Sequence, residues 1–186
     1  MHRMPEVITH NYHPARGGLQ NLCALPRPEA EAILSEIRDS GLSRMKLNYL
    51  ERRLETEQWL LAARTRKLGR PYLAHPIYFF FGDFADGRDP LRPASLVMPL
   101  AALPPDTVTF TYPDSMASLP LGTAEAHRPE RQPYHGQVFT LAEIKDVIRE
   151  FGLLGDRWRT DTYDRFIEVQ VWDDRPVRRF LKTRTA

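Results

Sequence analysis

Two polar side chains between aromatic residues near the C-terminus, in segment 163–172, are the strongest candidates for chemistry. The alternation of a β-strand places Phe166, Glu168, Gln170 and Trp172 on one face of this segment. A carboxylate and an amide between two large aromatic rings lie either at the rim of a sheet, beside an arginine, or in a cleft. In a cleft, Glu168 would hydrogen-bond a sugar hydroxyl or stabilise a developing positive charge. We therefore take Glu168 and Gln170 as the candidate catalytic pair.

Two histidines and a serine are weaker candidates. His10 and His13 form a His-x-x-His pair, but no third ligand lies nearby in sequence, so we expect loop hydrogen bonds and no metal. Ser115 follows Asp114 at the end of an expected strand, where Asp-Ser is typical of a turn or helix cap. Ser115 lacks the Gly-x-Ser-x-Gly context of a hydrolase nucleophile, although it could supply a hydrogen-bond donor at the mouth of a site.

The composition is that of an ordinary globular protein. The chain has 186 residues, 42% of them hydrophobic and 27% charged, which predicts a single domain over residues 1–186. The single cysteine, Cys23, excludes an internal disulfide framework and favours a cytoplasmic protein. Membrane insertion is not expected, because no apolar run approaches the roughly 20 residues that a membrane span needs. Basic residues crowd segment 175–186, which we interpret as a solvated basic tail or, alternatively, a phosphate-binding segment.

The order of expected elements predicts an α+β fold, with N-terminal helices packed on a mostly antiparallel sheet. Breakers and apolar runs indicate strands, and apolar residues at helical spacing indicate helices. The expected strands cover 5–13, as an edge strand, and 76–82, 95–100, 107–112 and 163–172. The expected helices start near Pro28, cover about 46–68, and run from the capping box Thr140–Glu143 to Gly152.

The helix over 46–68 has a leucine stripe and a charged surface. Leu47, Leu50, Leu54, Leu61 and Leu68 are expected to form its buried side. Mixed charges at these spacings usually face water. The residues assigned to this water-facing surface are Glu51, Arg52, Arg53, Glu55, Glu57, Arg64, Arg66 and Lys67.

The order of a histidine-bearing first strand, two helices, a tyrosine-bearing strand (Ile77-Tyr78-Phe79-Phe80) and a late strand with a lone glutamate resembles the ADP-ribosyltransferase superfamily. Over 95–115 and 166–177 the chain is similar to DNA-modifying ADP-ribosyltransferase toxins and to uncharacterised bacterial proteins. The resemblance implies an ADP-ribosyltransferase-like sheet and a transferase that consumes NAD.

In that scheme Glu168 holds a hydroxyl of the nicotinamide ribose and Tyr78 stacks on nicotinamide. His10 or His13 holds the adenosine ribose, and Ser115 lies in the same cofactor site. The target would be a macromolecule, with nucleic acid as one candidate through the basic tail. The alternative is a non-enzymatic interaction module of the same fold, in which Glu168 and Gln170 bond each other and nearby arginines.

Overall fold

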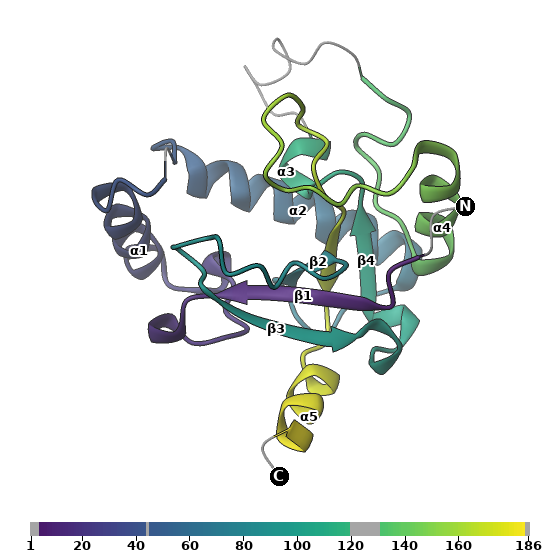
Figure 1. Cartoon of the computed structure of the whole chain (residues 1–186), viewed down its shortest axis with the longest axis horizontal. Coiled ribbons are helices and arrows are strands. Elements are labelled where there is room, and N and C mark those ends of the chain that lie inside the picture. Colours follow the sequence, from purple (N-terminus) through teal and green to yellow (C-terminus); the bar gives the residue numbers. More distant parts are fainter. Residues whose placement is uncertain (1–3, 44, 120–130, 185–186) are drawn as a thin grey trace.

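A five-stranded antiparallel sheet with the strand order β3-β1-β2-β5-β4 organises the protein in the computed structural model (Figure 1). The structure describes residues 4–43, 45–119 and 131–184. The strands are β1 (Val7–Tyr12), β2 (Ile77–Phe81), β3 (Ala94–Pro99), β4 (Val108–Thr111) and β5 (Glu168–Val171). The helices are α1 (Arg27–Asp39), α2 (Tyr49–Leu68), α3 (Ser115–Ser118), α4 (Leu141–Phe151) and α5 (Arg175–Arg184). The predicted α+β class and antiparallel sheet are therefore confirmed.

One face of the sheet carries the main hydrophobic core. Alternate residues of the central strands point to this side, and α4 and α5 pack against it through Ile144, Ile148 and Val177. The strand residues of this core include Ile8, Ile77, Phe79, Phe81, Val108, Phe110, Val169 and Val171. Helix α4 begins at Thr140 with the predicted capping box, in which Thr140 Oγ1 and the Glu143 carboxylate each accept a backbone N–H.

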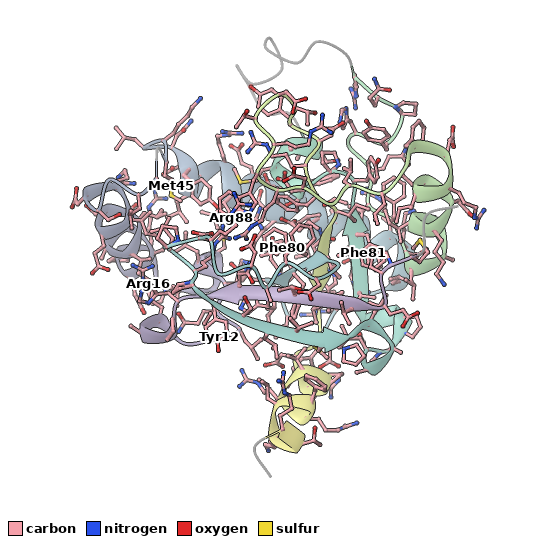
Figure 2. All side chains as sticks on the ribbon, in the orientation of Figure 1. Tyr12, Arg16, Met45, Phe80, Phe81 and Arg88 are labelled. Carbon is pink, nitrogen blue, oxygen red and sulfur yellow. The ribbon has the colours of Figure 1, made fainter. Side chains whose placement is uncertain are left out.

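The opposite face of the sheet is polar and lies under α2. Neighbouring residues Phe80 and Phe81 of β2 belong to opposite faces (Figure 2), because Phe81 enters the main core whereas Phe80 packs against Phe84 and Phe166. On the polar face, Gln170 bonds the hydroxyls of Thr109 and Thr111. The polar groups on this buried face thus satisfy one another, as burial requires.

Two strand predictions were wrong in detail. Strand β1 is not an edge strand, because it pairs with β3 from Val7↔Pro99 to Tyr12↔Ala94 and also with β2. Strand β5 is limited to four residues, whereas the alternation suggested ten. Its ladder with β4 stops at Thr111↔Glu168, and Pro113, two residues beyond Thr111, has no N–H to extend it.

The C-terminal basic segment is a helix and not a solvated tail. Val177 on α5 is buried, and Phe180 and Leu181 pack against the main core. Its arginines face outward, with Arg175 paired to Asp173 and Arg178 to Asp174. The arginines alone suggested a tail, whereas the apolar residues at helical spacing between them, Val177, Phe180 and Leu181, indicate a helix. None of the described helices is long and apolar enough to cross a membrane.

Candidate functional site

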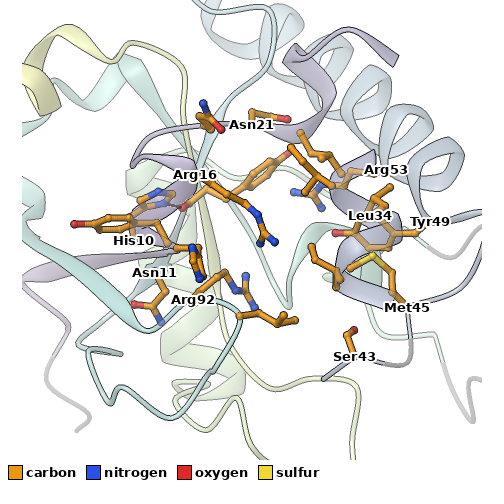
Figure 3. A pocket seen from close by; sticks show the side chains of 18 of the residues that line it. His10, Asn11, Arg16, Asn21, Leu34, Ser43, Met45, Tyr49, Arg53 and Arg92 are labelled. Carbon is orange, nitrogen blue, oxygen red and sulfur yellow. Dashed lines mark hydrogen bonds between the residues drawn. The ribbon is translucent and has the colours of Figure 1, made fainter. Parts of the chain in front are cut away.

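A cavity of about 430 Å³ opens beside the end of β1, between α1, the start of α2 and the polar face of the sheet (Figure 3). Four of the predicted site residues line this cavity: His10, His13, Tyr78 and Glu168. Arg16, Arg53 and Arg92 line it as well, and in Figure 3 their side chains point toward its centre. The wall formed by α1 and the segments around it is apolar, with Leu22, Leu25, Ile33, Leu34, Ile37 and Met45.

Glu168 lies at the first residue of β5 and is 7% exposed. Its Oε1 accepts from Gln170 Nε2 at 3.1 Å and from the backbone N–H of Ser115 at 3.4 Å. Its Oε2 lies 3.8 Å from Arg53 Nη2. The carboxylate is therefore fixed mainly through one oxygen, and the other faces a cation that it approaches only loosely.

Gln170 and Ser115 support Glu168 from behind and do not line the cavity. Both are fully buried. Gln170 orients the carboxylate and is itself held by Thr109 and Thr111. Ser115 Oγ accepts from Arg53 Nη1 at 3.0 Å, so Ser115 contacts both the carboxylate and the guanidinium. Both predicted site residues therefore hold the Glu168 carboxylate in position and do not face the cavity.

Tyr78 lines the cavity with its ring, while its hydroxyl donates to Glu57 Oε1 at 2.8 Å. Burial raises the pKa of Tyr78 well above its ordinary value, so the phenol stays protonated. The guanidinium of Arg53 covers one ring face at 3.8 Å from the centroid. Stacking of nicotinamide on that face would require Arg53 to move aside.

Arg53 and Glu57 are the site residues that the sequence analysis missed. Both were assigned to a water-facing surface of α2, and that prediction was wrong: Arg53 is 8% exposed and Glu57 3%. Leu47, assigned to the buried stripe, is 84% exposed. The available signal was the spacing of Leu50, Arg53, Glu57, Leu60 and Arg64, which alternates three and four residues and marks one helix face.

The guanidinium of Arg53 remains charged despite its burial. Burial alone acts to lower the pKa of Arg53, but the negative charges of the nearby Glu168 and Glu57 act against this effect and the pKa is raised. The base of the cavity therefore carries one fixed positive charge between two carboxyl groups.

His10 is inside β1, and both of its ring nitrogens have partners. Leu19 N–H donates to Nε2 at 3.2 Å, so the neutral ring carries its proton on Nδ1, which donates to Tyr78 O at 2.7 Å. Burial lowers the pKa of His10, which keeps the ring neutral. A ligand hydroxyl would have to displace one of these bonds to reach His10.

His13 lies just after β1, where its Nδ1 accepts from Ala15 N–H at 3.3 Å. It begins the short 3₁₀ turn that carries Arg16 into the cavity. Across the residues described, no three His, Cys, Asp or Glu side chains are grouped to hold a metal ion.

Comparison of the chain with protein-family models, with curated proteins and with solved structures finds no match. The case for a function therefore depends on the geometry of the cavity.

The bonds of His10 predict a pH dependence of stability. Its pKa is lowered from 6.5 on folding, so the unfolded chain binds the proton first as pH falls. Stability is retained above pH 6.5 and is lost below it, by at most about 1.4 kcal/mol per pH unit for one proton. His10→Gln keeps one donor and one acceptor without this titration. Melting temperatures between pH 7.5 and 5 should therefore fall less steeply in the variant than in the wild type. Equal slopes would show that His10 protonates freely in the folded protein.

Proposed function

We propose that the protein binds NAD in this cavity and transfers ADP-ribose to a macromolecule with release of nicotinamide. The observation that carries the proposal is the position of Glu168: a buried carboxylate at the wall of a cavity that Tyr78, two histidines and three arginines also line. In the resemblance to the ADP-ribosyltransferase superfamily, the late-strand glutamate holds a hydroxyl of the nicotinamide ribose and the tyrosine stacks on nicotinamide. His13, rather than the fully bonded His10, is the histidine that we assign to ligand contact.

The charge of the cavity suits a dinucleotide. NAD carries two negative charges on its pyrophosphate, and arginine side chains are well matched to phosphate oxygens. Arg16 is part of the 3₁₀ turn after β1, and Arg92 comes from the loop before β3 (Figure 3). Arg16 approaches Glu36 only to 3.6 Å, and water at this exposed pair screens the attraction. Arg92 is paired with the buried Asp89 at 2.9 Å, but its own side chain is half exposed. The apolar wall beside α1 offers a surface on which a nucleotide base can pack.

The reaction we propose is a displacement at the anomeric carbon of the nicotinamide ribose. The bond between this carbon and the nicotinamide nitrogen breaks, and its electron pair leaves with neutral nicotinamide. The acceptor oxygen or nitrogen then bonds to the carbon and loses its proton. Glu168 would hold a ribose hydroxyl and stabilise the positive charge that develops on the sugar. Gln170 and Ser115 would keep the carboxylate in place.

The acceptor we consider first is nucleic acid. Helix α5 packs beside Leu100–Ala102, at the Pro99 end of β3, whereas the cavity lies at the opposite end of that strand, next to Tyr12 (Figure 1). An acceptor that contacts both the basic helix and the cavity must therefore be extended, as a nucleic acid strand is.

We infer a cytoplasmic setting from the single cysteine, Cys23, which is buried and has its thiol pKa raised by burial to about 12.

A non-enzymatic interaction module remains the second candidate. The observation in its favour is that Glu168 already has Gln170, Ser115 and Arg53 as internal partners. Binding and turnover of NAD distinguish the two candidates.

Glu168→Gln tests the proposed reaction. The substitution keeps the shape of the side chain and removes its charge, so folding should be retained while nicotinamide release falls by at least about a hundred-fold. Glu150→Gln, on the exposed side of α4, is the matched control and should release nicotinamide at the wild-type rate. Nicotinamide is measured chromatographically with DNA, RNA and protein acceptors. No release by the wild type, together with no thermal shift in millimolar NAD, would favour the interaction module.

Arg16→Ala and Arg92→Ala test the pyrophosphate assignment. Each removes a charge-assisted contact, so the Kd for NAD measured by calorimetry should rise about ten-fold, which corresponds to about 1.4 kcal/mol. Arg149→Ala, on the exposed surface of α4, should leave the Kd unchanged. Equal affinities in all three variants would place the pyrophosphate elsewhere.

A further inference from the structure

We propose that Glu57 is a positioning residue that holds Arg53 away from Glu168 and so keeps that carboxylate free for a ligand. The proposal rests on the proposed function where it concerns NAD turnover. Its structural part, the position of Arg53, does not depend on any ligand.

Glu57 is the most completely bonded carboxylate near the cavity. Its Oε1 accepts from Asn21 Nδ2 and from Tyr78 OH, each at 2.8 Å, and its Oε2 bonds His75 Nδ1 at 2.6 Å. Asn21 is itself tied to Pro76 O at 2.7 Å, immediately before β2. Three segments distant in sequence therefore fix Glu57, and its side chain does not line the cavity.

The guanidinium of Arg53 lies between the carboxylates of Glu57 and Glu168. Its Nε lies 3.7 Å from Glu57 Oε1, one helical turn along α2, and its Nη2 lies 3.8 Å from Glu168 Oε2. Both separations exceed the length of a hydrogen bond. The direct bond of the guanidinium is to Ser115 Oγ at 3.0 Å, and its plane rests on the Tyr78 ring. The guanidinium, held by Ser115 and the Tyr78 ring, thus lies at similar distances from the carboxylates of Glu57 and Glu168 without bonding either.

Loss of the attraction between Arg53 and Glu57 would leave the attraction between Arg53 and Glu168 unopposed. Without the charge of Glu57, Arg53 would close on Glu168 to form an ion pair with hydrogen-bond contact. That pair would occupy Oε2, the oxygen that is not bonded by Gln170 or Ser115. A ribose hydroxyl would then have to compete with a guanidinium for the carboxylate.

Glu57→Gln tests this inference by crystallography and by kinetics. The distance from Arg53 Nη2 to Glu168 Oε2 should shorten from 3.8 Å to about 2.9 Å. The kcat for nicotinamide release should fall about ten-fold, because the carboxylate is occupied during the reaction. An unchanged distance in a folded variant would overturn the inference.

Two further variants separate charge from packing. His75→Ala removes a hydrogen bond to Glu57 but keeps its charge, so Arg53 should stay in place; displacement here as well would show that general loosening moves it. Tyr78→Phe frees Glu57 Oε1 from one donor, so Arg53 should move toward Glu57 and away from Glu168. This opposite shift tests the inference even if Glu57→Gln does not fold, and an unmoved Arg53 would contradict it. Should the wild type release no nicotinamide, the proposed function fails while these distances still decide the role of Glu57.

Discussion

The sharing of one buried guanidinium between two buried carboxylates is the constraint on which the rest of the site depends. Charges removed from water are costly unless they are paired and hydrogen-bonded. Glu57, Arg53 and Glu168 meet this requirement together, because each has at least one further polar partner. The same need for polar partners affects the sheet. On the face under α2, threonine and glutamine side chains replace the apolar residues that a helix-covered face normally carries.

The sheet topology brings these groups together. Strands β2 and β5 are adjacent although about 90 residues separate them, and the pairs Tyr78↔Gln170 and Phe80↔Glu168 place the tyrosine and the glutamate on one face. The cavity forms where the pairing between β1 and β2 ends. Strands β1 and β2 pair only through Ile8↔Phe81 and Thr9↔Phe80, and the ring of His10 bonds Tyr78 O just beyond. The walls are thus built from strand ends and the helices packed over them.

Local sequence patterns predicted the elements well and their relations poorly. The capping box at Thr140 and the α2 terminator Gly69 are local chemistry, so the helix ends could be predicted. The place of β1 inside the sheet depends on partners distant in sequence, which periodicity cannot show. Glu168 was found because a carboxylate breaks an apolar strand. Arg53 and Glu57 were missed because charged residues on a long helix usually face water, and only the three-dimensional partners explain their burial.

The central claim is that the cavity beside Glu168 receives the nicotinamide ribose of a dinucleotide. A crystal structure with a non-cleavable carbocyclic analogue of NAD tests it most directly. The account predicts a ribose hydroxyl within hydrogen-bond distance of a Glu168 oxygen, with the pyrophosphate between Arg16 and Arg92. An analogue bound elsewhere, or an empty cavity at millimolar analogue with Arg53 still resting on Tyr78, would contradict it.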